Sequence, residues 1–255
     1  MSVPAVTARR ILRRDLRGSS SPVVVETDAG PYFVKLRGAA QGTAALVSEV
    51  IVGALADRLE LPVPPRRVVT LDSSTPTDDR NDELADLLRA SVGENLGFRY
   101  LEAARPFRPA DMERVSPEFA SRVRWLDWLT LNPDRSPENP NVLVDGPRFW
   151  LIDHGAALPF QHDWSAVTEQ MPEREESICP HVFDGAATRW AEEDAALTAR
   201  LDREALGRAV EEVPESFLTP LLPEGATDDM LRRRRSAYVA FLWKRLRGRR
   251  RHAAD

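Results

Sequence analysis

The chain is poor in cysteine and in long apolar segments, and each shortage excludes a class of protein. Cysteine occurs once, at Cys179, so no internal disulfide can form, and such sparse use is typical of a reducing compartment. No apolar run approaches the roughly 18–20 residues that a membrane-spanning helix needs. Residues 1–14 carry arginines but no apolar core of a secretory signal. We therefore expect a cytoplasmic protein without a membrane-spanning helix.

Lysine is almost as scarce as cysteine. The chain has 35 lysines and arginines, yet only Lys35 and Lys244 are lysines. Lys35 lies within the apolar segment 32–36, which has the composition of a strand. Because an ammonium is a compact charge and a guanidinium is a wide planar fork, a narrow phosphate pocket cannot easily exchange one for the other. Lys35 is therefore a candidate for binding an anionic ligand, and a surface lysine at a strand edge is the alternative.

The remaining composition is that of an ordinary globular protein. Hydrophobic residues make up 42% of the 255 residues and charged residues 29%, and the net charge is −5. This length suits one two-lobed domain or two small ones. A negative chain does not bind nucleic acid over its whole surface. Basic residues do gather at 232–235 and 244–252. These segments could form a solvated helix face or contact nucleic acid, and the sequence leaves both interpretations open.

The order of expected elements changes from strands to helices near residue 102. Strands are expected at 23–26, 32–36, 68–71 and 96–101, a strand or short helix at 5–16, and helices at 45–59 and 83–90. After a connector at 103–110 come a helix at 117–131, a hairpin at 142–144 and 149–152, and helices at 185–213 and 228–248. The pattern predicts an α+β fold of two lobes. A β-rich N-terminal lobe covers residues 1–102, and a mainly helical C-terminal lobe covers residues 103–255 of the same domain.

Two polar segments flank the expected hairpin. The first runs from 132 to 141 and holds Asp134, Asn139 and Asn141; its three prolines exclude a helix or a central strand. The second is Asp153-His154-Gly155, directly after an apolar strand. Loops on a rigid scaffold are where catalytic groups tend to lie. We therefore treat both segments as candidates for chemistry.

These residue types fit phosphoryl transfer, which depends on positioning and charge neutralisation. One carboxylate orients the attacking hydroxyl, an asparagine and a second carboxylate hold Mg²⁺, and an ammonium contacts the phosphates. Protein kinases arrange these parts as a strand lysine, then D-x-x-x-x-N, then D-F-G. Lys35, Asp134, Asn139 and Asp153 occur here in that order. Glu49 lies on the apolar face of the expected helix, where a lone carboxylate needs a cation, and so it is expected to pair with Lys35.

Several segments resemble the HipA-like kinase family: 32–35, 46–49, 61–64, 132–141 and 151–158. The resemblance implies a bilobal, protein-kinase-like fold that binds ATP and Mg²⁺. It implies that Lys35 is the ATP lysine, Asp134 the catalytic base, and Asn139 and Asp153 the metal ligands. It also implies a phosphate-covering turn and a hinge that meets adenine. The turn residues are Gly18, Ser19, Ser20 and Ser21, and the hinge residues are Tyr100 and Leu101.

The expected activity is transfer of the γ-phosphate of ATP to a hydroxyl acceptor, with a protein serine or threonine as the first choice. A small-molecule kinase and a nucleotide-binding pseudokinase that acts through a protein partner are the alternatives. Individual residues have simpler explanations too. Asp134 and the asparagines could cap turns, and Asp153 could cap a helix. Asn141 competes with Asn139 as the metal ligand; the spacing of five residues from Asp134 favours Asn139.

Overall fold

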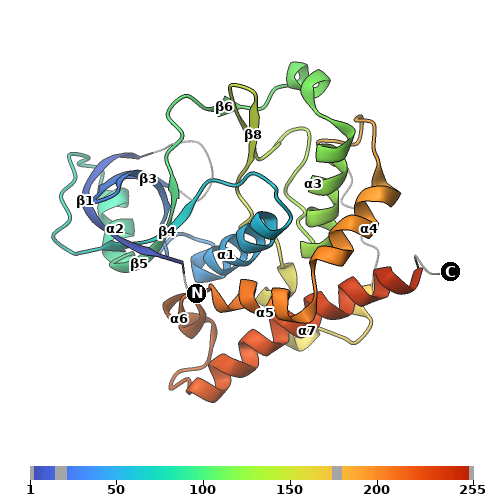
Figure 1. Cartoon of the computed structure of the whole chain (residues 1–255). Coiled ribbons are helices and arrows are strands. Elements are labelled where there is room, and N and C mark those ends of the chain that lie inside the picture. Colours follow the sequence, from blue (N-terminus) through green and yellow to red (C-terminus); the bar gives the residue numbers. More distant parts are fainter. Residues whose placement is uncertain (1–2, 15–21, 174–179, 253–255) are drawn as a thin grey trace.

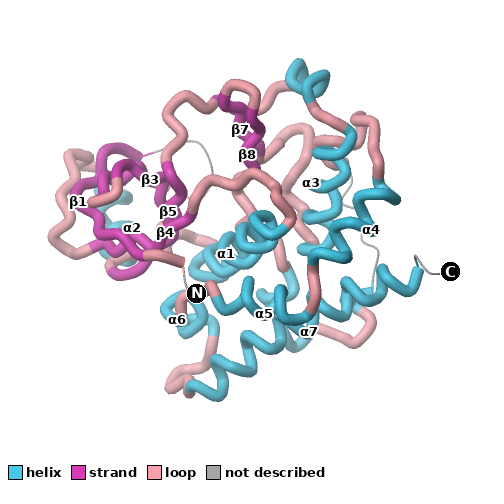
Figure 2. Tube along the Cα trace, in the orientation of Figure 1, coloured by secondary structure: helices cyan, strands magenta, loops and turns pink. Residues whose placement is uncertain are grey.

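The computed structural model describes residues 3–14, 22–173 and 180–252. A barrel of strands lies on one side and a larger group of helices on the other, with a small sheet above them in this view (Figures 1 and 2). This is a mixed α+β fold, as the order of strands and helices predicted.

The barrel closes through a pairing that sequence patterns did not predict. Its strand order is β1-β2-β3-β5-β4, and β1 also pairs with β4 in parallel. Tyr32 and Val34 of β3 belong to the apolar cluster inside the barrel. Because side chains alternate along a strand, Phe33 and Lys35 point to the outside. The strands are β1 (Ala5–Arg14), β2 (Val23–Thr27), β3 (Gly30–Lys35), β4 (Arg66–Leu71) and β5 (Gly93–Arg99). The helix α2 (Asp82–Ala90) precedes β5.

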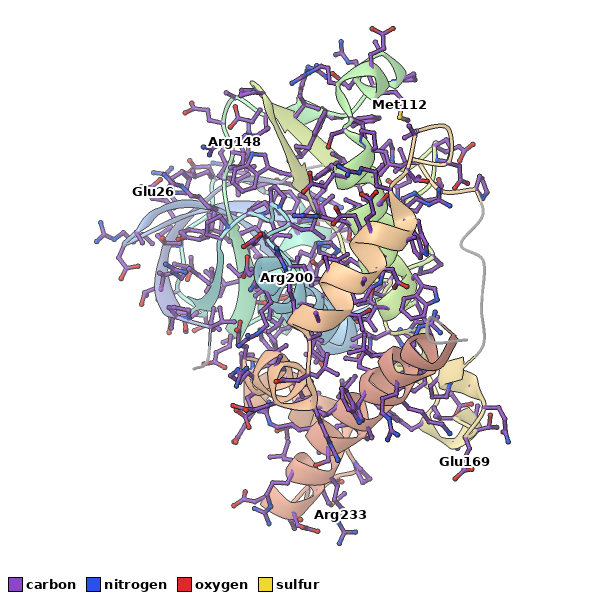
Figure 3. The ribbon with its side chains drawn as sticks, turned by 45° about the vertical axis from the view of Figure 1, so that its right-hand side comes forward. Glu26, Met112, Arg148, Glu169, Arg200 and Arg233 are labelled. Carbon is purple, nitrogen blue, oxygen red and sulfur yellow. The ribbon has the colours of Figure 1, made fainter. Side chains whose placement is uncertain are left out.

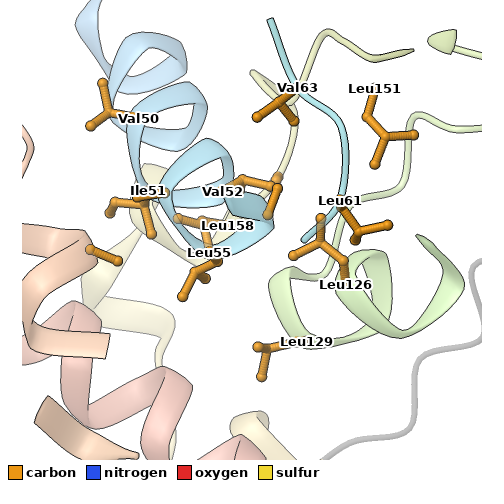
Figure 4. Close-up of a cluster of buried hydrophobic side chains, with 14 of the residues drawn as sticks. Val50, Ile51, Val52, Leu55, Leu61, Val63, Leu126, Leu129, Leu151 and Leu158 are labelled. Atoms are coloured by element: carbon orange, nitrogen blue, oxygen red, sulfur yellow. The ribbon is translucent and has the colours of Figure 1, made fainter. Parts of the chain in front are cut away.

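Helix α1 (Gly42–Arg58) lies at the centre of the molecule. All residues from Thr43 to Ala56 are buried, so the helix is covered on every side. It contacts both α5 (Arg203–Glu211) and α6 (Glu215–Leu218), which come much later in the chain. Figure 4 shows its side chains Ile51 and Leu55 beside Leu158, and Leu126 of a later helix beside Leu61; all belong to one buried cluster. The main core therefore contains residues from both sides of residue 102. The division into two lobes, 1–102 and 103–255, stays a prediction.

The second half of the chain is mostly helical. The helix expected at 117–131 is α3 (Pro117–Thr130). Ser116 caps it by accepting from the N–H of Phe119, and the hairpin β7–β8 follows. The connector contributes β6 to the hairpin's sheet. The elements are β6 (Arg105–Pro106), η1 (Pro109–Arg114), β7 (Val142–Asp145), β8 (Arg148–Leu151), η2 (Pro159–His162), η3 (Trp164–Ala166), η4 (Met171–Glu173), α4 (Trp190–Arg200), α5 (Arg203–Glu211), α6 (Glu215–Leu218), η5 (Thr219–Leu221) and α7 (Asp228–His252).

The single helix expected over 185–213 is wrong, because two helices occupy it. Leu201 is extended, and the Asp202 carboxylate accepts from the N–H of Ala205 at 2.6 Å, so a new helix begins there. Within the described ranges, no helix is both long and apolar enough to cross a membrane.

Candidate active site

Lys35 is the point at which distant parts of the chain meet. Its Nζ atom donates to Oε1 of Glu49 on α1, and to Oδ1 of Asp153 at 2.5 Å. Asp153 lies 118 residues away from Lys35, just after β8. The predicted pairing of Lys35 with Glu49 is confirmed. The side chains of Lys35 and Glu49 are 9% and 0% exposed, whereas that of Asp153 is 43% exposed and reaches solvent.

The charges at this point control each other's pKa. Burial alone would lower the pKa of Lys35, but the carboxylates of Glu49 and Asp153 outweigh it and raise that pKa. Burial alone would raise the pKa of Asp153, and the charge of Lys35 overcomes it and lowers the pKa. Burial raises the pKa of the Glu49 carboxyl. The site therefore presents a charged ammonium beside an ionised, partly exposed carboxylate.

Asp134 lies in the loop between α3 and β7, with both candidate asparagines beside it. Asn139 Nδ2 donates to Oδ1 of Asp134 at 2.8 Å. Asn141 Nδ2 donates to the backbone carbonyl of Asp134 at 2.5 Å and lies 3.3 Å from its Oδ2. The N–H of Asp134 donates to Oδ1 of Asn132 at 3.1 Å. Asn139 is exposed and Asn141 is buried.

The small sheet joins this loop to Asp153. Strands β7 and β8 pair, and the N–H of Ile152 donates to the carbonyl of Asn141 at 3.1 Å. Asn141 and Asp153 have φ values of 48° and 57°, the left-handed region that non-glycine residues seldom adopt. Such conformations persist where surrounding contacts hold them, and they gather at functional sites.

A buried cluster under the Asp134 loop was missed by sequence reasoning. Asp127 on α3 accepts from Nε of Arg135 at 2.6 Å, from Nδ2 of Asn132 at 2.8 Å and from Nε2 of His181 at 3.1 Å. Arg135 Nη1 in turn donates to the carbonyl of Asn141 at 2.6 Å. Asp127 and Arg135 are both 0% exposed. Asn132 and Arg135, which flank Asp134 in the loop, are therefore held in place by the buried Asp127 carboxylate.

The two histidines near this cluster have assignable protons. His181 Nδ1 accepts from the N–H of Phe183 at 3.1 Å, so its proton lies on Nε2 and is donated to Asp127. Arginine only donates, so His154 Nδ1 accepts from Nη2 of Arg135 at 3.2 Å. Burial and Arg135 lower the pKa of His154 to about 3, so this ring is neutral near pH 7. Burial alone would raise the pKa of Asp127, but Arg135 and His181 lower it.

Comparison with known proteins identifies the family of the chain. A family model described as HipA-like kinase matches residues 8–220. The chain belongs to the HipA-like kinase family. The crystal structure of the Helicobacter pylori proinflammatory kinase CtkA is similar, with a TM-score of 0.55 and 13% sequence identity over 95% of this chain and 98% of that chain. At that identity the likeness shows a common fold. No curated protein sequence matches the chain.

In this HipA-like kinase the expected hinge follows β5. The N–H of Tyr100 donates to the carbonyl of Pro31 at 3.1 Å, and the guanidinium of Arg13 lies 5.4 Å from the centre of the Tyr100 ring. That N–H is therefore used within the fold, and the role of Tyr100 and Leu101 as the hinge that meets adenine stays a prediction. The expected phosphate-covering turn lies outside the described residues: Gly18, Ser19, Ser20 and Ser21.

The arginines at 232–235 contact the HipA-like kinase chain itself. Arg233, which projects from α7 in Figure 3, and the arginine before it form ion pairs with Asp229 at 2.8 and 3.6 Å. The guanidinium of Arg234 lies over the ring of Trp164, 4.8 Å from its centre. Arg235 donates to the carbonyl of Val210 in α5 and to that of Val213, which follows α5. The side chains of Arg232 and Arg233 are still 69% and 81% exposed, so a nucleic-acid contact at this cluster stays an untested alternative.

Proposed function

We propose that this HipA-like kinase binds ATP with Mg²⁺ and transfers the γ-phosphate to a hydroxyl acceptor. The observation that carries the proposal is the bonding of Lys35 to both Glu49 and Asp153, close to a loop in which Asp134 is held by two asparagines. The kinase family of the chain gives this geometry its chemical meaning.

Lys35 supplies the ammonium that faces the phosphates of the nucleotide. Glu49 fixes its position from α1, and the burial of both side chains strengthens the attraction between them. Because α1 is covered on every side, the pair is held in place by the main core. This arrangement supports binding of a triphosphate at the outer face of β3.

The residues present suit Mg²⁺, a hard cation that prefers oxygen ligands and keeps water and phosphate oxygens in its shell. Asp153 would hold it with its partly exposed carboxylate, together with the amide oxygen of Asn139 or Asn141. Magnesium bound there would neutralise charge on the phosphates. Among the described residues no group of three or more His, Cys, Asp or Glu could hold a metal ion by itself.

Asp134 is the proposed catalytic base. Its carboxylate is partly exposed, and Asn139 Nδ2 fixes its orientation. It would orient the acceptor hydroxyl and take its proton as the phosphoryl group transfers. We favour a protein serine or threonine as the acceptor, with a small-molecule hydroxyl or a pseudokinase without turnover as the alternatives. In this proposal residues 1–102 and 103–255 act as the two lobes.

The test is ADP release by the purified chain, measured with ATP in the presence and absence of Mg²⁺. We expect slow release that requires Mg²⁺, and a rise in Tm with ATP that is larger when Mg²⁺ is present. A rise in Tm without ADP release would favour the pseudokinase. The absence of both would contradict the proposal.

The two asparagines can be separated by paired variants. The Asn141 side chain is buried and donates to the Asp134 carbonyl, and it lies in the residue whose backbone carbonyl pairs with Ile152 next to Asp153. The Asn139 side chain is exposed and donates to the Asp134 carboxylate. We therefore expect Asn141→Ala to reduce kcat about tenfold more than Asn139→Ala and to raise the Mg²⁺ concentration needed for half-maximal ADP release. Titration of both variants with Mg²⁺ checks this. A larger Mg²⁺ shift in Asn139→Ala would assign the ligand to the residue that the sequence spacing favours.

A further inference from the structure

Three buried polar side chains connect α1, the segment after Asp153 and α7. Ser48 Oγ donates to the carbonyl of Ala157 at 2.7 Å and accepts from Nε2 of Gln161 at 2.6 Å. The hydroxyl of Tyr238 donates to Oε1 of Gln161 at 2.8 Å. Ser48 and Tyr238 are 0% exposed and Gln161 is 5% exposed. Each side chain belongs to a different element: α1, η2 and α7.

The three side chains lie next to the proposed nucleotide site. Ser48 directly precedes Glu49, and Ala157 is the fourth residue after Asp153. Gly155 lies between them in the same segment, so close to α1 that a Cβ atom there would be 3.3 Å from Cβ of Ala45 and 3.6 Å from Oε1 of Glu49. The segment that begins at Asp153 therefore follows α1 through contacts at 155, 157 and 161.

We infer that Ser48, Gln161 and Tyr238 are positioning residues that fix Asp153 relative to Glu49 and Lys35. The inference rests on the proposed function, because it concerns the placement of the proposed Mg²⁺ ligand. Asp153 and Leu158 both have φ values of 57°, so the segment is held in a conformation that non-glycine residues disfavour. Ala157, which accepts the hydrogen bond from Ser48, lies between these two residues in the sequence, and the bond holds the segment against α1.

The Gln161 amide links Ser48 to Tyr238. The Ser48 proton is donated to Ala157, so Oγ can only accept from Nε2 of Gln161, and Oε1 at the other end of the amide accepts from the Tyr238 hydroxyl. The Tyr238 ring is itself held edge-on against Trp164, with ring centres 5.0 Å apart. Helix α7 therefore belongs to the machinery that places Asp153, although its sequence carries no motif of the family.

Two single-atom variants test the inference: Ser48→Ala and Tyr238→Phe. Each removes one hydroxyl and leaves Asp153, Glu49 and Lys35 unchanged. Loss of one buried hydrogen bond should raise the Mg²⁺ concentration for half-maximal ADP release by roughly threefold to tenfold. Excess Mg²⁺ should restore most of the rate. A merely structural role would lower Tm and the amount of active protein without moving the Mg²⁺ dependence.

Matched controls come from other parts of the chain. Ser121→Ala removes a buried hydroxyl that accepts from the N–H of Arg189, and Tyr32→Phe removes a hydroxyl from a buried tyrosine of the barrel. Both should keep the Mg²⁺ dependence of the unaltered chain. Equal Mg²⁺ dependence in test and control variants overturns the positioning role while the proposed function stands. An unaltered chain without Mg²⁺-dependent ADP release contradicts the proposed function itself. Should Ser48→Ala fail to fold, Tyr238→Phe decides.

Discussion

Replacing Asp134 by asparagine is expected to reduce ADP release and phosphoryl transfer by roughly 100- to 10,000-fold, the range for loss of a general base. The change keeps the size of the side chain and an oxygen for the bond from Asn139, so the loop should keep its conformation. Nucleotide binding should persist, because Lys35 and Asp153 are untouched. Turnover assays together with thermal shifts in Mg-ATP measure both parts of the expectation.

The neighbouring acid Glu138 provides the control for Asp134. It is exposed in the same loop, and Glu138→Gln should keep full activity. Asp153→Ala should differ from both, because it removes the proposed Mg²⁺ ligand and one of the two partners of Lys35. It should lose turnover and also the additional rise in Tm that Mg²⁺ gives with ATP. Full turnover by both Asp134→Asn and Asp153→Ala would remove the assignment of these residues.

The sequence predicted the contact between Lys35 and Glu49 because each residue was unusual in its surroundings. Lys35 interrupts an apolar strand in a chain with only one other lysine, and Glu49 lies on the apolar face of a helix. A buried charge needs a partner, so the two could be paired without coordinates. Their roles toward ATP stay predictions, as do those of Asp134, Asn139 and Asp153.

The same argument would have found Asp127, which lies between Leu126 and Trp128 on the apolar part of the expected helix. The argument would not have identified the partners of Asp127, which are Arg135 and His181. Arg135 is one of many arginines, and His181 is 54 residues away in a segment with no periodic pattern. Pairings of this kind depend on tertiary packing, and so does closure of the barrel through β1 and β4. The break at Asp202 did have a local signal, because aspartate is a preferred helix cap.

The largest effect on stability is expected from Asp127→Asn. The variant leaves the guanidinium of Arg135, which is 0% exposed, without its carboxylate. Breaking a buried ion pair by removing one partner costs about 3–5 kcal/mol, because the remaining charge stays buried. The free energy of unfolding, measured with urea at pH 7, should fall by that amount. The control is Asp229→Asn, the same change at the exposed pair with Arg233, where the loss should be far smaller.

The difference between Asp127→Asn and the unaltered chain should depend on pH in one direction. Arg135 and His181 lower the pKa of Asp127 in the folded state, so its contribution is complete above the unfolded pKa, about 3.9. As the pH falls below about 4, the unfolded state takes up a proton before the folded state does, and the contribution shrinks. The two unfolding free energies should therefore run parallel from pH 8 to about 5 and approach each other in acid. A gap that widens in acid would contradict an ionised Asp127 as the buried partner of Arg135.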